Sequence, residues 1–142
     1  MAVRREYPTI VPSYRGINIY QLTNAQVMTP AVGGSVYVEL DSVQNMSEFR
    51  CLLVFVNITA IAGTWTIRPV TRMRLASFTV RHVILNSLSV AGRTTTGMIE
   101  VGYNCYSGAN TLVADLVEVE FLKTAGLVGD SITVTSDALF YN

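Results

Sequence analysis

The most continuously apolar stretch of the chain is residues 49–59, with the sequence FRCLLVFVNIT. Seven of its first eight positions carry apolar side chains, several of them β-branched or aromatic, which favours a strand over a short helix. Successive residues of a strand point to opposite faces, so a run that is apolar at consecutive positions predicts burial on both faces. We therefore expect residues 49–59 to form the central strand of the fold.

A turn and a second strand are predicted directly after this stretch. Residues 60–63 end in Gly63 and are followed by residues 64–67, in which two threonines alternate with Trp65 and Ile67. Strict alternation is typical of a strand that is buried on one face only. The two segments are expected to form a central antiparallel hairpin, with the first strand buried on both faces and the second on one.

The beginning of the chain differs from the remainder, and we expect two parts: an extended arm with a short edge strand at 1–34, and a body with a C-terminal tail at 35–142. Prolines at both ends of residues 8–12 hold the backbone extended and predict the arm. Alternation at 17–22 predicts the short edge strand, and the glycines that end 29–34 predict a loop. The arm is expected to lie either on a neighbouring subunit or on the sheet of its own chain.

Further strands are predicted in the body from the alternation of apolar and polar residues. A half-buried strand is expected at 36–40, a break at 68–72 around Pro69, and a long extended stretch at 73–85. The apolar phase of that stretch changes near Ser77, which is typical of a β-bulge or of a strand that crosses between sheets.

A second hairpin and a last strand are predicted in the remainder of the chain. A polar loop at 89–97 precedes alternating residues at 98–106 and 112–122, and a turn rich in Ser, Gly and Asn joins these two segments into a hairpin. A short strand at 130–135 and an apolar tail at 138–142 are expected to follow.

These elements predict an all-β protein. The strands are short and closely spaced, and the pattern contains neither a long helix nor a sequence repeat. The expected architecture is an antiparallel β-sandwich or a partly closed barrel, similar to a jelly roll or a β-tulip, with extended terminal arms.

Composition points towards association with other protein chains. Half of the residues are hydrophobic, 14% are charged and the mean hydropathy is +0.38, so part of the surface is expected to be covered by other copies or by another protein. No apolar run reaches the roughly 20 residues of a membrane span, and residues 1–8 have no apolar segment after their arginines, so neither a membrane partner nor a secretory signal is expected. The net charge of zero argues against nucleic acid as a partner, because counterion release needs a basic face.

Charge is divided unequally along the chain. Residues 1–93 carry nine Arg and four acidic residues, a balance of +5, whereas residues 94–142 carry one Lys and six acidic residues, a balance of −5. This division arises either by chance in a small set of charges, or because opposite patches meet across subunits and fix their orientation.

Residues that carry chemistry in other proteins are few and poorly placed for catalysis. His82 is the only histidine and has no nucleophile turn nearby, and Cys51 and Cys105 lie far apart without a CxxC partner. We expect a structural or surface histidine, and two buried thiols or, as the alternative, a cross-strand disulfide. Glu118 and Glu120 share one strand face and are expected to be solvated, not to oppose each other across a cleft as in glycosidases. No catalytic residue, cofactor or metal is therefore expected.

Residues 49–67, the proline-containing arm and the scarcity of charge together resemble the head decoration proteins of tailed phages, most closely those of phages that infect thermophilic bacteria. The resemblance implies a thermostable homotrimer that binds the outside of an expanded capsid and clamps neighbouring subunits of the major capsid protein. Such a protein is made in the host cytoplasm and resides on the capsid surface of the virion. It is not an enzyme, and neither nucleic acid nor a membrane is an implied partner.

Under this interpretation both ends of the chain bind the capsid, and the copies of a trimer pack through exposed apolar positions of the body. The residues assigned to capsid binding are Arg4, Arg5, Tyr7, Ile10, Val11, Phe140 and Tyr141. Two alternatives stay open: a self-assembling jelly-roll coat or spike subunit, and a carbohydrate-binding β-sandwich module. The second alternative needs a row of exposed aromatic residues, whereas Trp65 is expected to face inward.

Overall fold

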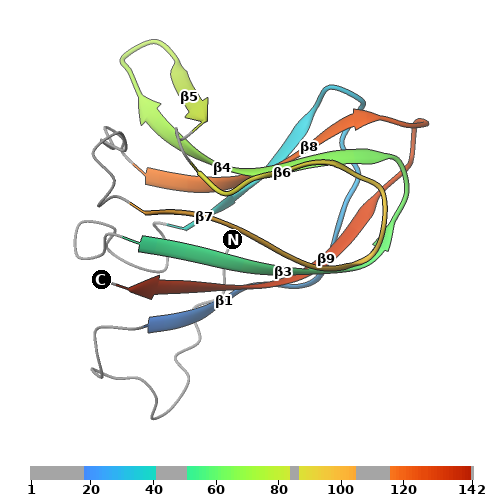
Figure 1. The fold of residues 1–142 in the computed structure, drawn as a ribbon. Helices are drawn as coiled ribbons and strands as arrows, with labels where there is room; N and C mark the ends of the chain where they lie inside the picture. The colour runs from blue at the N-terminus through green and yellow to red at the C-terminus, as the bar shows by residue number, and fades with distance from the viewer. Residues whose placement is uncertain (1–17, 41–50, 84–86, 105–115, 142) are drawn as a thin grey trace.

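The computed structural model describes residues 18–40, 51–83, 87–104 and 116–141 of the chain. Within these ranges there are nine β-strands and no helix (Figure 1). Every pair of neighbouring strands is antiparallel, and the strands form two sheets. The expected all-β class is confirmed.

The first sheet, sheet A, contains four strands in the order β1-β9-β3-β7. Their bounds are β1 (Asn18–Met28), β9 (Ile132–Tyr141), β3 (Cys51–Ile61) and β7 (Gly97–Asn104). The second sheet, sheet B, has the order β2-β8-β4-β5, and a fifth strand, β6, also pairs with β4. Their bounds are β2 (Ser35–Glu39), β8 (Leu116–Ala125), β4 (Thr64–Arg74), β5 (Thr79–Val83) and β6 (Val90–Arg93).

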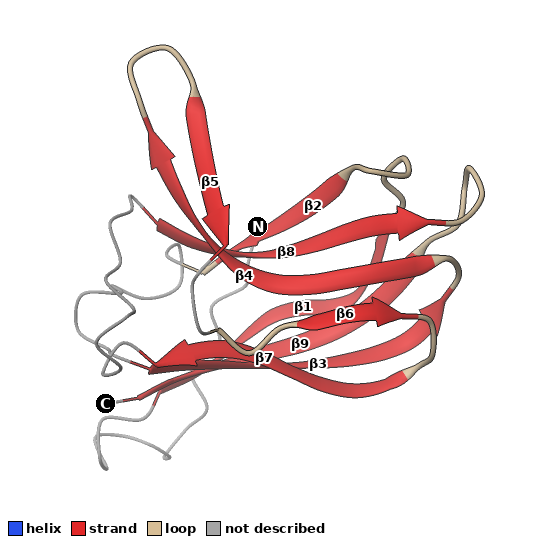
Figure 2. Cartoon of the chain, turned by 45° about the horizontal axis from the view of Figure 1, so that its top comes forward, coloured by secondary structure: helices blue, strands red, loops and turns tan. Residues whose placement is uncertain are grey.

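Figure 2 shows the two sheets as separate layers that face each other, so the architecture is an open β-sandwich and not a closed barrel. The chain passes from one layer to the other at most of its connections, since β1, β3, β7 and β9 lie in sheet A while β2, β4 and β8 lie in sheet B. β5 pairs with residues 70–74 of β4, and β6 pairs with Trp65 and Ile67 of the same strand. If β5 and β6 are counted as one interrupted strand, the two sheets together have the strand order of a jelly roll.

The core lies between the sheets and consists of the inward-facing residues of alternating strands. As predicted, Trp65 and Ile67 are fully buried between half-buried threonines, and the strand expected at 36–40 is present with Val38 and Leu40 facing inward. Sheet A contributes apolar residues of β1, β3, β7 and β9 to the same core.

β3 is buried on one face only, so the prediction of burial on both faces is wrong. Val54, Val56 and Ile58 belong to the core, whereas Leu53 and Phe55 are half-buried on the outer face of sheet A. A two-layer sandwich covers each sheet on one side, and apolar residues on the other side therefore stay partly exposed.

Both predicted hairpins are wrong, although the turn between β3 and β4 is where it was expected. β3 pairs with β7 and β9, while β4 pairs with β5, β6 and β8, so the turn carries the chain from sheet A to sheet B. Gly63 in this turn has a φ of 85°, and a Cβ atom there would lie 2.8 Å from the carbonyl oxygen of Ala125. β7 and β8 likewise lie in different sheets. Alternation along a strand identifies its buried face but not its neighbours.

β4 continues through the break expected at 68–72. Pro69 pairs with Val119 of β8, and on the other edge of β4 it lies between the residues that pair with β6 and those that pair with β5. Strands tolerate proline at such interruptions in pairing. The phase change near Ser77 marks the turn of the β4–β5 hairpin, not a bulge or a crossing, and residues 90–93 of the expected loop form β6. Figures 1 and 2 both show the β4–β5 hairpin projecting beyond the rest of the sandwich.

The first and last strands are neighbours in sheet A. The predicted edge strand is present as β1, which continues to Met28 with irregular pairing around Thr23. The tail expected at 138–142 is instead part of β9 as far as Tyr141, and β9 lies between β1 and β3. The inward-facing series of β9 reaches Ala138 without interruption, which explains why the strand does not stop at residue 135.

Candidate functional site

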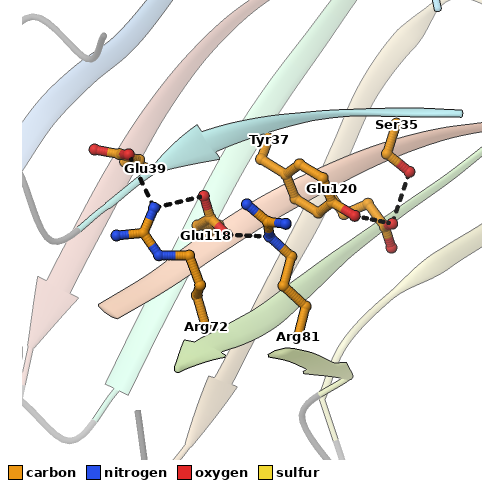
Figure 3. A network of polar contacts seen from close by, with 7 residues as sticks. All are labelled: Ser35, Tyr37, Glu39, Arg72, Arg81, Glu118 and Glu120. Carbon is orange, nitrogen blue, oxygen red and sulfur yellow. Dashed lines mark hydrogen bonds and ion pairs between the residues drawn. The ribbon is translucent and has the colours of Figure 1, made fainter. Parts of the chain in front are cut away.

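The main cluster of charged side chains in the described residues lies on the outer face of sheet B (Figure 3). Glu118 and Glu120 of β8 point away from the core, as the alternation predicted, but they are only 2% and 6% exposed. The expectation that both are solvated is therefore wrong. Neighbouring strands place arginine and tyrosine side chains in the same row, and these long side chains cover the two carboxylates.

Glu120 accepts hydrogen bonds from three side chains. Its Oε2 atom accepts from the hydroxyls of Ser35 at 2.7 Å and Tyr37 at 3.1 Å on β2, and its Oε1 atom accepts from Nε of Arg68 on β4 at 2.5 Å. Burial alone would raise the pKa of Glu120, but these hydrogen bonds and the charge of Arg68 together hold the pKa below its ordinary value. Glu120 therefore stays ionised to lower pH than an ordinary glutamate.

Glu118 connects β8 to β4 and to β5. Its Oε1 atom accepts a hydrogen bond from Nε of Arg81 at 2.8 Å, which raises the pKa of Arg81, and its Oε2 atom lies 3.9 Å from Nη1 of Arg72. The same nitrogen of Arg72 lies 3.4 Å from Oε1 of Glu39 on β2. The guanidinium group of Arg81 also lies over the ring of Tyr37, 3.9 Å from its centroid, in a cation–π contact.

These contacts join β2, β8, β4 and β5 through their side chains as well as through their backbones. Three guanidinium groups and three carboxylates take part, so their formal charges cancel. A glycosidase needs a protonated acid that faces a second carboxylate across a cleft. Glu118 and Glu120 instead lie on one strand, and each is bound by arginine. The arrangement is suited to fixing the positions of the strands relative to one another.

Stability is expected to fall in acid because of Glu120. Its pKa in the folded chain is lower than the ordinary value of 4.5, so its stabilisation is complete above that value and is lost as the pH falls through the folded pKa. We expect urea titrations to give a falling free energy of unfolding between about pH 5 and pH 3, and a shallower fall for Glu120→Gln. Equal slopes for the two proteins would contradict this assignment.

Lys123 is a buried anchor that the sequence analysis missed. Its side chain is fully buried, and Nζ donates hydrogen bonds to the carbonyl oxygens of Leu127 at 2.7 Å and Asp130 at 2.9 Å, both in the turn between β8 and β9. The sequence indicates this burial through the alternation along β8, because Lys123 continues the inward-facing series that includes Val119 and Phe121. A lysine at a core position of a strand needs hydrogen-bond acceptors close by.

The residues expected to bind a capsid are only partly within the described ranges. Those of the arm lie outside them: Arg4, Arg5, Tyr7, Ile10 and Val11. Phe140 and Tyr141 lie in β9, where the backbone of Phe140 pairs with Asn18 and Leu52, and that of Tyr141 pairs with Cys51. The last two candidates therefore occupy a paired central strand instead of a free tail.

His82 lies in β5 opposite Thr71, Cys51 begins β3, and Cys105 is outside the described residues. The described part of the chain contains no group of three or more His, Cys, Asp or Glu that could hold a metal ion. It also contains no helix that is long and apolar enough to cross a membrane. Comparison of the chain with family models, curated proteins and solved structures gives no match.

Proposed function

We propose that the protein is a structural subunit of a virion that associates with copies of itself to form a shell or a vertex. The observation that supports this most directly is the strand order, with two sheets connected as in a jelly roll. The jelly roll is a frequent architecture of viral capsid subunits, and lectins and cupins use it as well. Because one fold carries several functions, the choice among them rests on the side chains.

The side chains favour assembly over carbohydrate binding. A carbohydrate-binding module presents a row of exposed aromatic residues. Trp65 is instead fully buried, with its indole N–H donating to the carbonyl oxygen of Ala62 at 2.8 Å, and Phe78 is exposed by itself on the β4–β5 turn. The charges on the outer face of sheet B bind one another and are not directed towards a ligand. Apolar residues instead reach solvent on two turns: Leu127 and Val128 between β8 and β9, and Leu75 and Phe78 between β4 and β5. Exposed apolar residues that lie together are typical of contacts between proteins.

A decoration protein, which the sequence resembles, is the second candidate. Both functions need a rigid β body and contacts between copies, and they differ in what the pure protein does. A coat or spike subunit assembles by itself, whereas a decoration protein forms a homotrimer that adds to an existing capsid. The jelly-roll strand order favours the coat or spike subunit, and the capsid-binding assignment for the arm remains a proposal.

Light scattering and electron microscopy of the pure protein distinguish the two candidates. We expect species far heavier than the 15.5 kDa chain, in the form of rings or closed particles, at micromolar concentration. A discrete trimer that never grows would favour the decoration protein, and its binding to bare expanded capsids would then be measured. A monomer at every concentration would overturn both candidates.

A further inference from the structure

The outer part of the β4–β5 hairpin is joined to sheet B at its base only. β4 pairs with β8 as far as Arg72, and Arg72 lies opposite Arg81 of β5, the last strand in the order of sheet B. Residues 73–80, which we call the flap, follow this pair of arginines, and no other strand of the described chain lies beside them. Figures 1 and 2 show the flap projecting from the sandwich. A two-stranded ribbon is only marginally stable by itself, so the contacts at its base decide how firmly it is held.

The base of the flap brings two positive charges together. Arg72 and Arg81 are directly opposite each other in the register of β4 and β5, and like charges at such positions destabilise the pairing of strands. Glu118 offsets this repulsion, because its Oε1 atom accepts a hydrogen bond of 2.8 Å from Nε of Arg81 and its Oε2 atom lies 3.9 Å from Nη1 of Arg72. Glu39 lies 3.4 Å from Arg72. Of the ion pairs at the base, those of Glu118 therefore connect the two strands of the hairpin.

Arg81 extends the contact from β5 to β2. Figure 3 shows its guanidinium group between the carboxylate of Glu118 and the ring of Tyr37, whose centroid lies 3.9 Å away. In the order β2-β8-β4-β5 this one side chain spans the two strands between β5 and β2. The side chain of Arg81 is 33% exposed, so water competes for its hydrogen bonds. The contact can thus open locally while the core stays folded.

The closed arrangement carries an opposing cost at Arg72. Its Nε atom is buried and has no hydrogen-bond acceptor in the described part of the chain. A buried donor without an acceptor is unfavourable, and opening of the base gives it access to water. The closed flap is therefore favoured by Glu118 and Tyr37 and opposed by Arg72, and such a balance is typical of an element that populates two positions.

We infer that the flap is a hinged element that opens at its base, and that Glu118 is the clamp that keeps it closed. In the closed position Arg72 and Arg81 share Glu118, and the apolar side chains of the tip, Leu75 and Phe78, are 41% and 62% exposed and held in place. In the open position Arg81 is in water and the tip moves freely. The clamp thus sets how rigidly the tip is presented. This inference concerns motion within one chain and does not depend on the proposed function.

Hydrogen exchange of the full-length chain tests the role of Arg81. The N–H of Leu75 reports on the flap, because it donates to the carbonyl oxygen of Phe78 at 2.8 Å. We expect Arg81→Met to accelerate its exchange about tenfold. The matched control is Arg68→Met, which removes the bond to Glu120 in the same network but outside the flap, and which is expected to leave exchange at Leu75 within about threefold.

A second comparison separates the clamp from a merely structural role of the hydrogen bonds. Glu118→Gln leaves Arg72 and Arg81 facing each other, and we expect exchange at Leu75 to accelerate about 30-fold or more. Adding Arg72→Met to Glu118→Gln removes the repulsion, so exchange is expected to slow again by at least about threefold. If the hydrogen bonds alone mattered, the added substitution would leave exchange unchanged or accelerate it.

Two outcomes would overturn the inference. The first is equal exchange at Leu75 in Arg81→Met and Arg68→Met, and the second is a double variant that exchanges as fast as Glu118→Gln alone or faster. Thermal unfolding checks that each variant is folded, and light scattering checks that all are compared in the same state of association. Exchange at the N–H of Leu40, which donates to the carbonyl oxygen of Val117 far from the flap tip, serves as the internal reference.

Discussion

Replacing Glu118 with alanine is expected to lower the free energy of unfolding by about 2–3 kcal/mol. Glu118 is 2% exposed, accepts a hydrogen bond from Arg81 and lies 3.9 Å from Arg72, so its loss leaves two guanidinium groups without this carboxylate. Removing one partner of a fully buried ion pair costs roughly 3–5 kcal/mol. The expected value is smaller because the side chain of Arg81 is 33% exposed and regains contact with water. Urea unfolding at neutral pH measures the difference.

Glu100→Ala is the matched control, since Glu100 lies on β7 in the other sheet and its side chain is exposed. Its substitution is expected to change the free energy of unfolding by less than about 0.5 kcal/mol. A second replacement, Arg81→Met in the background of Glu118→Ala, is expected to cost less than it does in the wild-type protein, because the partner charge is already gone. Equal losses for Glu118→Ala and Glu100→Ala would show that the network does not stabilise the fold.

Replacing Lys123 with methionine is expected to lower the free energy of unfolding by about 2 kcal/mol and to loosen the β8–β9 turn. Methionine fills nearly the same space, so the loss comes from the carbonyl oxygens of Leu127 and Asp130, which no longer have their donor. Removing a buried amine recovers part of the cost of its desolvation, which keeps the expected loss moderate. Urea unfolding and hydrogen exchange at the N–H of Leu127 measure the two effects, and exchange there is expected to accelerate.

Arg93→Met provides the comparison for this second substitution. Arg93 also donates to two turn carbonyl oxygens, those of Thr95 at 2.7 Å and Thr96 at 2.8 Å, but its side chain is only half-buried. Water replaces these hydrogen bonds, so the expected loss is below about 1 kcal/mol. If Lys123→Met were no more harmful than Arg93→Met, burial of the amine would not be what fixes the β8–β9 turn.

The class of the fold was predictable because a period of two residues is a local property of the sequence. Trp65 and Ile67 alternate with threonines and are buried, and the β8 alternation placed Glu118 and Glu120 on the outer face. The pairing of strands is not local. The turn at Gly63 joins strands of different sheets, and nothing in residues 49–67 distinguishes this turn from that of a hairpin.

The candidate site was less predictable than the fold for a related reason. Alternation shows which way a side chain points, but whether an outward side chain is covered depends on the neighbouring strands. Arg68 and Tyr37 cover Glu120 because β4 and β2 flank β8, a relation that appears only once the sheet is assembled. Lys123 was in principle recognisable from its inward phase, since a charged residue in an apolar series requires buried partners.

The position of β9 has a consequence for the synthesis of the chain. β9 follows the other described strands in the sequence, yet it lies between β1 and β3 and pairs Phe140 with Asn18 and Tyr141 with Cys51. Sheet A therefore cannot close until β9 has been synthesised, and β1 and β3 have unpaired edges until then, which slows folding and exposes the nascent chain to aggregation. The β8–β9 turn is also completed only at this stage. A chain that lacks β9 therefore has neither the closed sheet A nor the complete β8–β9 turn.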